Sequence, residues 1–528
     1  HELTLSRSIF TYTGSSPANT ALNTSSHTLH EDNNALTKAM LGIDSQTDDY
    51  RESLLEWAQG IDVLDEDGDS SVVDARNAIG DPLHSQPLIL NYFSDDDTED
   101  TSIYFTTNEG FLHGISTSDG SEHFAFIPQE LLSNLESYKT DNSNGTSKVY
   151  GLDGPMSAWF NDANGDGDIL QGSGGSVDSG EHLYLYLTMR RGGRNIYALD
   201  VTNRNNPIYK WIIKGGSGDF EEIGQTWSKP TLAKVKINDV EKTVLIFGGG
   251  YDVGQDDVTE ITADDVGRAI YIVDAETGER LWWSSINDAA TLPLSDMKYS
   301  IPSNITNVDI DNDGYDDFFY VADMGGQVWR FDIDNNNTTV SGLVSAGVVA
   351  MLSDSSDTGA RRFYNQPDIS LVNVRGTTPY LTIAIGSGFR AHPLNTDTTD
   401  RFYMIKDSNV FNAPSSYQYV SGASASTITE INLYDATEDL IDSTTEAVAT
   451  AAKTAMNSAY GWYITLENEG EKVLAESITY DFKLLFTTFS PSGDTVTTCG
   501  PDTGIGRLYL VNLLDATPVL DSDRDTLG

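Results

Sequence analysis

The chain has 528 residues, and its 31 Lys and Arg against 80 Asp and Glu give a formal net charge of −49. A surface this acidic repels nucleic acids and anionic membranes, so neither is an expected partner. The acidic excess is equally consistent with a salt-rich habitat, which would require no function. Hydrophobic residues make up 38% of the chain and aromatic residues 10%, which is enough for a large core.

The sequence contains few signals that would indicate processing or a cellular compartment. Cys499 is the single cysteine, so an intramolecular disulfide is excluded in this chain. No run of about 18 apolar residues occurs, so no segment is predicted to span a bilayer. The chain begins HELTLSRSIF, without an initiating Met or a signal-peptide pattern, and we expect a fragment or a processed form.

Short apolar runs alternate with Gly, Asn, Asp and Ser along the chain, which is typical of an all-β protein. Residues 47–61 have apolar side chains at helical spacing and residues 443–459 are rich in Ala, so both are predicted to be helical insertions or flanks. We expect residues 1–78 to form an N-terminal flank with a short helix. Its strand around residues 7–12 is a candidate for completing a seventh blade.

One unit recurs after this flank: an apolar strand, a Gly-rich turn and a second strand that reads roughly aromatic-x-apolar-Asp. Its six copies are residues 103–120, 183–201, 244–252 with 268–278, 318–333, 381–389 with 401–407, and 484–493 with 506–515. Proline-bearing segments precede five of them, starting at residues 85, 153, 228, 300 and 365. A further strand often follows, as at residues 207–214 and 280–286.

Four strands per unit predict antiparallel sheets that cannot cover both of their faces alone, so successive units must stack. Radial stacking covers the faces and hides the edges. We therefore predict a β-propeller over residues 79–528, with six blades visible as repeats and a seventh that the N-terminal strands are candidates to complete. The alternative is a set of β-sandwiches, which is less favoured because all six copies keep the same order of elements.

The segment DIDNDGYDD, residues 309–317, places carboxylates at alternate positions between two apolar strands. Ca²⁺ takes six to eight oxygen ligands, and a chain supplies them most compactly from alternate residues, with a glycine such as Gly314 for the sharp turn. The spacing predicts a calcium-binding hairpin, and the alternative is an ordinary Asp- and Gly-rich turn. The predicted ligands are four carboxylates and one backbone carbonyl: Asp309, Asp311, Asp313, Asp317 and Tyr315.

Two further acidic loops are candidates for the same ion, with a solvated turn as the alternative for each. DANGDGD lacks an acid at position 9 or 12, and its candidate ligands are Asp162, Asn164, Asp166 and Asp168. DEDGDSSVVD has its glycine out of register, and its candidate ligands are Asp65, Asp67, Asp69 and Asp74.

No catalytic residue is predicted. The eight histidines have no metal-ligand spacing, and no GxSxG, HExxH or P-loop motif occurs. His84 and His392 are most simply structural. Residues 270–283 resemble the repeat of pyrroloquinoline-quinone-dependent dehydrogenases, propellers that also bind calcium. Those enzymes commonly stack the quinone on a vicinal disulfide, which one cysteine cannot form, so this enzyme class is kept as the alternative.

The order of the motifs resembles the C-terminal domain of the PilC/PilY family of type IV pilus biogenesis factors and tip adhesins. The resemblance runs from about residue 50 to the end and rests on residues 79–90, 104–128, 223–235, 267–282, 307–333, 383–390 and 484–491. It implies a modified seven-bladed propeller with one calcium loop of the kind found at residues 309–317.

The resemblance also implies a secreted protein at the pilus tip or outer surface of a Gram-negative bacterium. The implied partners are minor pilins of the tip complex and a host or abiotic surface. The implied roles are pilus assembly, opposition to retraction in the calcium-bound state, adhesion and twitching motility. The family's N-terminal von Willebrand-A-like region is missing, consistent with a fragment, and no Arg-Gly-Asp triplet occurs, which argues against integrin-type adhesion.

A surface adhesin unrelated to pili is the second alternative. Such a protein would use its propeller to bind a sugar or another protein, with exposed aromatic side chains in the site. Trp159, Trp227 and Trp462 are the candidates, and a place in the core is the competing interpretation for each.

Overall fold

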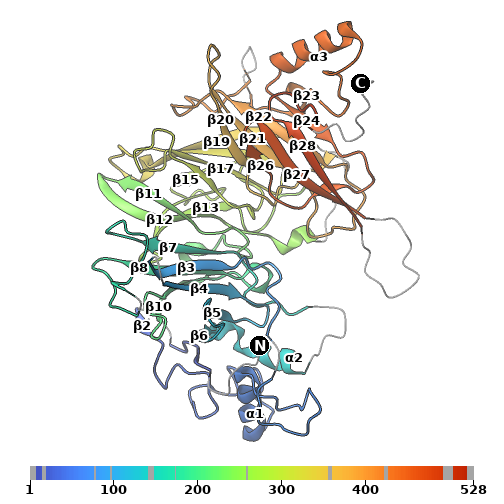
Figure 1. Ribbon diagram of the computed structural model, residues 1–528. Helices are drawn as coiled ribbons and strands as arrows, with labels where there is room; N and C mark the ends of the chain where they lie inside the picture. The colour runs from blue at the N-terminus through green and yellow to red at the C-terminus, as the bar shows by residue number, and fades with distance from the viewer. Residues whose placement is uncertain are drawn as a thin grey trace, which may run out of the picture. The chain divides into compact units, whose positions relative to one another are not determined.

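The computed structural model describes residues 7–14, 19–76, 79–95, 98–140, 148–172, 174–256, 260–354, 359–420, 426–491 and 504–519. In these ranges strands dominate and form six sheets of four or five strands (Figure 1). The chain divides into two compact units. The first is His1–Glu221, Gln225–Leu232 and Ala275–Glu279, and the second is Glu222–Gly224, Ala233–Asp274 and Arg280–Gly528.

The described strands of the first unit form two sheets. Sheet 1 has the order β1-β6-β5-β4-β3 and consists of β1 (Ile9–Phe10), β3 (Leu88–Ser94), β4 (Glu99–Thr106), β5 (Leu112–Ser116) and β6 (Glu122–Phe126). Sheet 2 has the order β2-β10-β9-β8-β7 and consists of β2 (Thr20–Ala21), β7 (Met156–Asn161), β8 (His182–Thr188), β9 (Ile196–Asp200) and β10 (Ile208–Ile213).

Sheets 3 and 4 belong to the second unit, apart from the first two residues of β11. Sheet 3 runs in chain order and consists of β11 (Thr231–Ile237), β12 (Val240–Gly248), β13 (Ala269–Asp274), β14 (Arg280–Ser285) and β15 (Leu292–Pro293). Sheet 4 also runs in chain order and consists of β16 (Thr306–Val308), β17 (Phe318–Ala322), β18 (Gln327–Ile333) and β19 (Val344–Met351).

Sheets 5 and 6 complete the described part of the second unit. Sheet 5 has the order β20-β21-β22-β24-β23 and consists of β20 (Asp368–Val372), β21 (Tyr380–Gly386), β22 (Arg401–Asp407), β23 (Tyr434–Asp435) and β24 (Gly461–Thr465). In sheet 6 the strand β27 pairs with the other three, and the sheet consists of β25 (Lys472–Val473), β26 (Ile478–Tyr480), β27 (Lys483–Ser490) and β28 (Ile505–Asn512).

The helices are short and few, as predicted. The two predicted segments contain α1 (Asp48–Gln59) and α3 (Glu446–Ser458), and α2 (Leu135–Lys139) is a third. Thr47 caps α1 by accepting the amide of Tyr50, and Gly60 ends it in a left-handed conformation. Among the residues that the structure describes, the 3₁₀ turns include Gln129–Asn134, Arg190–Gly192, Gly218–Phe220, Val253–Asp256, Val340–Gly342 and Glu430–Asn432. No helix among the described residues is long and apolar enough to cross a membrane.

Each of the six predicted repeats supplies two neighbouring antiparallel strands of one sheet, from β4 and β5 in sheet 1 to β27 and β28 in sheet 6. The five proline-bearing segments lead into β3, β7, β11, β16 and β20, and each of these strands lies at an edge of its sheet. Proline has no N–H to give to a ladder, so it is tolerated where a strand has one free side.

Successive residues of the central strands enter two different cores. In β17, Phe319 and Val321 belong to a cluster shared with sheet 3, whereas Phe318 and Tyr320 belong to a cluster shared with sheet 5. The strand β22 alternates in the same way between sheet 4 and sheet 6. A strand buried on both faces reads as a continuous apolar run, which explains the FFYVA of β17.

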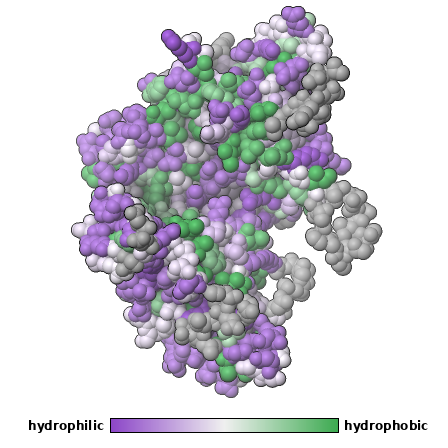
Figure 2. Space-filling model, in the orientation of Figure 1, coloured by the Kyte–Doolittle hydropathy of each residue, from purple (hydrophilic) through white to green (hydrophobic). Residues whose placement is uncertain are grey.

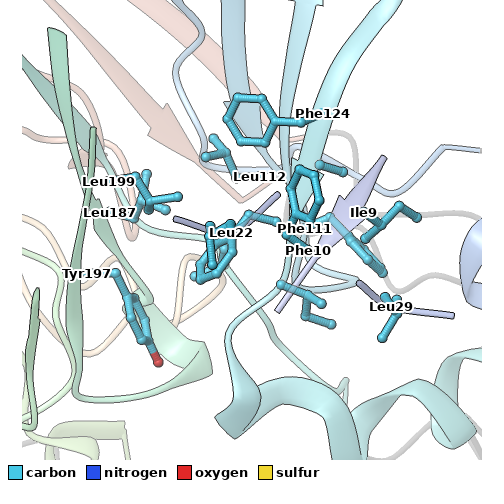
Figure 3. Packing of buried hydrophobic residues seen from close by; sticks show 14 of the residues in the cluster. Ile9, Phe10, Leu22, Leu29, Phe111, Leu112, Phe124, Leu187, Tyr197 and Leu199 are labelled. Atoms are coloured by element: carbon cyan, nitrogen blue, oxygen red, sulfur yellow. The ribbon is translucent and has the colours of Figure 1, made fainter. Parts of the chain in front are cut away.

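The N-terminal flank shares the core of the first unit. Ile9 of β1 lies opposite Ala125 in a parallel pairing with β6, and Thr20 of β2 lies opposite Tyr209 of β10. Figure 3 shows Ile9, Phe10, Leu22 and Leu29 among residues of both sheets, including Phe111, Leu112, Phe124, Leu187, Tyr197 and Leu199. The flank therefore adds a fifth strand to each of sheets 1 and 2, and the predicted boundary at residue 78 stays a prediction.

The last sheet is less covered than the central ones. Hydrophobic surface gathers over sheet 6 on the face shown in Figure 2. Ile478 of β26 is 62% exposed, and Ile505 and Leu508 of β28 are 49% and 65% exposed. The apolar residues of β17, by contrast, are buried on both faces of their sheet.

A buried ion-pair network links sheets 4 and 5. Arg330 of β18 lies 2.9 Å from a carboxylate oxygen of Asp407 at the end of β22, and 2.7 Å from Asp332. The side chains of Arg330 and Asp407 are 1% and 0% exposed. The hydroxyl of Tyr320 also donates to Asp407 at 2.8 Å. A charge this deeply buried is tolerated only with its partner in place.

We expect Arg330→Met to lower the free energy of unfolding by about 3–5 kcal/mol, because it leaves the buried Asp407 carboxylate without its cation. Urea unfolding followed by tryptophan fluorescence measures the change. Lys298→Met is the control, since Lys298 is 48% exposed and 3.9 Å from Asp296, and its cost should stay within about 0.5 kcal/mol. Equal unfolding midpoints for the two variants would contradict the prediction.

Candidate metal centre

The predicted calcium loop connects two paired strands of sheet 4. β16 and β17 are antiparallel, and Val308 opposite Phe318 is their last pair before the loop. Asp309 and Asp317 are the next residues on each strand, so they face each other across the base of the hairpin. Pairing of the two apolar strands thus brings together the first and the last acid of the loop.

Backbone amides of the loop hold its carboxylates in place. The two carboxylate oxygens of Asp309 accept hydrogen bonds from the amides of Asp313 at 3.2 Å and Gly314 at 2.9 Å. At the base, Asp317 accepts a hydrogen bond from the amide of Ile310 at 2.8 Å. Gly314 has a φ of 91°, a left-handed conformation that favours glycine, and this allows the chain to turn around the carboxylates.

The loop brings three of the predicted ligands together. One carboxylate oxygen from each of Asp309, Asp311 and Asp317 lies within 4.8 Å of the other two. Oxygens around one Ca²⁺ are at most about 5 Å apart, so this spacing fits a single ion, and an all-oxygen donor set suits a hard cation. Asp313 is outside this group, and its Oδ1 accepts the amide of Tyr315 at 2.9 Å.

Burial and crowding both disfavour the charged form of the cluster. Burial raises the pKa of Asp317 above its ordinary value, and the carboxylates of Asp311 and Asp309 raise it further. Burial also raises the pKa of Asp316, with smaller contributions from Asp309 and Asp317. A divalent cation among these carboxylates would replace repulsion by attraction.

The hairpin is tied to the edge strand of sheet 3. The amide of Asp316 donates to the carbonyl of Lys234 in β11 at 2.9 Å, and the amide of Lys234 donates to the Asp316 carboxylate at 2.9 Å. The Tyr315 hydroxyl donates to Glu241 of β12 at 2.8 Å. Asp316 is an anchor that the spacing of the predicted ligands did not reveal. Its position couples the order of the hairpin to sheet 3.

The second predicted loop occupies the corresponding place in sheet 2. The last pair of β7 and β8 before the loop is Asn161 opposite His182, so Asp162 and Glu181 face each other at the base. Carboxylate oxygens of Asp162, Asp166 and Glu181 lie within 4.8 Å of one another. Glu181 was not among the predicted ligands. The signal for it is an acid directly before the second strand, the same position that Asp317 has before β17.

A second group of carboxylates in this loop shares Asp166. Oxygens of Asp166, Asp168 and Asp178 lie within 4.8 Å of one another, and Asp178 was also not predicted. Burial raises the pKa of Asp168, and the carboxylates of Asp166 and Asp178 raise it further. The amide oxygen of Asn164 accepts the amide of Asp166 at 2.8 Å, so its predicted role as a ligand stays a prediction.

The third predicted loop gathers three of its four candidates. Oxygens of Asp65, Asp67 and Asp69 lie within 4.8 Å of one another, and Asp74 is outside this group. The buried carboxylate of Asp62 accepts the amide of Glu66 at 2.8 Å and so organises the turn. Calcium binding at this loop stays a prediction.

The tryptophan candidates for a ligand site lie mainly in the core. Trp462 is fully buried, and Trp227 is 7% exposed. Trp159 is half-buried, and its ring meets that of His182 edge-on with the centroids 4.4 Å apart. The competing interpretation, a place in the core, therefore holds for Trp462 and Trp227.

The segment that resembles quinoprotein repeats is also part of a sheet. Residues 270–283 run through β13, a turn and most of β14, and every residue of β13 is buried. Tyr271 stacks on Trp283 with ring centroids 5.9 Å apart. The apolar residues of the motif fill the core. His84, which was expected to be structural, lies with its Nδ1 2.7 Å from a carboxylate oxygen of the buried Asp153. Cys499 lies outside the described residues.

Replacing Gly314 tests the geometry of the calcium loop. A Cβ at this position meets no atom within 4 Å, so the cost of Gly314→Ala comes from the left-handed backbone and should be about 1 kcal/mol. Gly314→Asn should cost less, because Asn tolerates this conformation. Urea unfolding in calcium-free buffer measures both variants, and a larger loss for Asn than for Ala would contradict the geometry.

Several known proteins are similar to this chain in sequence. Residues 79–382 match the family described as the PilY1 beta-propeller domain. The chain is 29% identical over 238 residues to the type IV pilus biogenesis factor PilY1 of Pseudomonas aeruginosa, which is 44% of this chain and 17% of the relative. It is 25% identical over 415 residues to a PilY1 homolog of Xylella fastidiosa, which is 74% of this chain and 24% of the relative.

The chain therefore aligns with no more than about a quarter of the length of these curated relatives. Among solved structures, the C-terminal domain of Pseudomonas aeruginosa PilY1 has a TM-score of 0.49 and 20% identity, with 79% of each chain covered. The resemblance read from the motifs and the predicted propeller class are confirmed by the family match. Since that match covers more than half of the chain, the protein belongs to the PilY1 beta-propeller domain family.

Proposed function

We propose that the chain is a calcium-binding, non-enzymatic propeller domain of a type IV pilus biogenesis factor. The proposal is carried by the convergence of Asp309, Asp311 and Asp317 in one hairpin loop, in a chain that belongs to the PilY1 propeller family. The loop donors are all oxygens, and the carboxylates are already turned toward one another by backbone hydrogen bonds, so they fit Ca²⁺.

Calcium binding would strengthen the contact between the hairpin and sheet 3. When bound, Ca²⁺ supplies the positive charge that offsets the carboxylate cluster. The carboxylates of Asp309, Asp311 and Asp317 would hold the ion, with the Asp313 carboxylate and the Tyr315 carbonyl as the remaining predicted ligands. With the repulsion offset, Asp316 keeps its paired hydrogen bonds to Lys234. Without this compensation the hairpin is expected to open and its contact with β11 to weaken.

In the cell we place this domain outside the membrane, at the pilus tip or outer surface of a Gram-negative bacterium. Its proposed partners are minor pilins of the tip complex and a host or abiotic surface. In the calcium-bound state it would support pilus assembly, oppose retraction and mediate adhesion. Extracellular calcium modules have dissociation constants of about 10⁻⁴–10⁻³ M, which suits a protein that responds to the outside medium.

Asp311→Ala tests the proposed ion site directly. In the parent protein, calcium should slow hydrogen exchange of the amides that line the hairpin, such as those of Asp313 and Gly314, because ordered carboxylates hold these hydrogen bonds. In Asp311→Ala this calcium-dependent slowing should disappear. The exposed Glu279→Gln is a charge-matched control and should keep it. Unchanged slowing in Asp311→Ala would place the ion elsewhere.

A cell experiment tests the pilus role separately. The full-length gene is deleted and replaced by the parent sequence, by Asp311→Ala or by Glu279→Gln, and surface pili are counted by electron microscopy. We expect few pili with Asp311→Ala, and recovery of their number in a strain that cannot retract pili. Few pili in both strains would argue against a role in opposing retraction, and parental numbers would argue against any role of the ion site.

A further inference from the structure

The loop between β7 and β8 contains two deeply buried carboxylates, each with one oxygen that accepts no hydrogen bond from the described part of the chain. Glu181 is 6% exposed, and its Oε1 accepts hydrogen bonds from the amides of Ala163 at 3.2 Å and Asn164 at 3.1 Å. Its Oε2 has no hydrogen-bond partner among the described residues. Asp168 is also 6% exposed, and no residue that the structure describes forms a hydrogen bond with its Oδ1. Its Oδ2 has a long contact of 3.5 Å to the amide of Ser94.

These carboxylates face other carboxylates. Carboxylate oxygens of Glu181, Asp162 and Asp166 lie within 4.8 Å of one another. The same holds for oxygens of Asp168, Asp166 and Asp178. Within the part of the chain that the structure describes, none of the five forms an ion pair with Lys, Arg or His. Burying an ionised carboxylate without a partner is costly, and a ring of like charges adds to the cost. A cation bound among these carboxylates would supply the compensating charge.

The base of the loop explains why the two most distant acids meet. Asn161 pairs with His182, and the next residues on each strand are Asp162 and Glu181. The amide of Gly167 donates to Asp162 at 2.8 Å, which turns the loop back over its own base. Gly167 has a φ of 90°, so the turn has the same glycine conformation as the loop of sheet 4.

We propose that Asp162, Asp166 and Glu181 form a second divalent-cation site, of the calcium class, with Asp168 and Asp178 as the acids next to it. The donors are carboxylate oxygens from two segments of chain, a set that suits Ca²⁺ better than Mg²⁺, which keeps most of its water ligands. Glu181 is the decisive member, because it brings an oxygen from the position directly before β8 to the acids that follow β7. The proposal does not depend on an ion at residues 309–317.

The site lies where the loop meets sheet 1. The amides of Ile169 and Leu170 both donate to the carbonyl of Tyr92 in β3 at 3.0 Å. The side-chain amide of Asn91 donates to the carbonyl of Gly167 at 2.8 Å. β3 is the edge strand of sheet 1 and β7 is the edge strand of sheet 2. A cation held by the loop would thus fix the contact between two successive sheets of the first unit.

Glu181→Gln tests the site by its stoichiometry and by local protection. By equilibrium dialysis with ⁴⁵Ca²⁺, the variant should bind about one ion fewer per chain than the parent. Calcium should slow hydrogen exchange of the Ile169 and Leu170 amides in the parent but not in the variant. Protection of the 309–317 hairpin should be the same in both proteins, which separates this site from the other one.

Three further variants make the result decisive. Asp166→Asn removes an exposed carboxylate that both acid groups share, so it should reproduce the loss without disturbing a buried position. Asp311→Ala should leave the protection of Ile169 and Leu170 intact, and Glu279→Gln should change nothing. Parental stoichiometry and parental protection in Glu181→Gln and Asp166→Asn would overturn the proposal.

Discussion

Burial of the central sheets on both faces is the constraint on which the rest of the structure depends. Consecutive residues of β17 and β22 enter different cores, so neither face accepts an unpaired charge. Arg330 is tolerated in the core because it forms ion pairs with Asp332 and Asp407. Acidic side chains can otherwise gather where strands end, and the pairing of two strands then decides which acids face each other.

Much of the fold follows from the sequence because it is repetitive and local. The apolar runs identify the central strand pairs, and the prolines identify the edge strands. The strand expected around residues 7–12 contains β1, but its pairing with β6 could not be predicted. The strand β2 has two residues and no periodicity, so only its pairing with β10 reveals it. The N-terminal flank joins existing sheets through hydrophobic packing with residues far away in sequence, which no local pattern encodes.

The candidate site was predictable to the extent that its ligands are neighbours in sequence. The alternation of Asp309 and Asp311, and the acid before β17, identify the hairpin from its spacing. Spacing did not identify Glu181 as a candidate ligand, because antiparallel pairing of β7 and β8 places it beside Asp162. For Asp313 the ligand role stays a prediction that rests on spacing, and in this structure its Oδ1 accepts a hydrogen bond from the amide of Tyr315.

The prolines before the edge strands also affect the tendency of the chain to aggregate during folding. Long apolar strands with a free edge can recruit a strand from another molecule. Proline stands directly before β3, β7, β11 and β20 and offers no N–H at the point where an incoming strand would begin to pair. The residue type that marks each repeat thus also discourages intermolecular sheet growth.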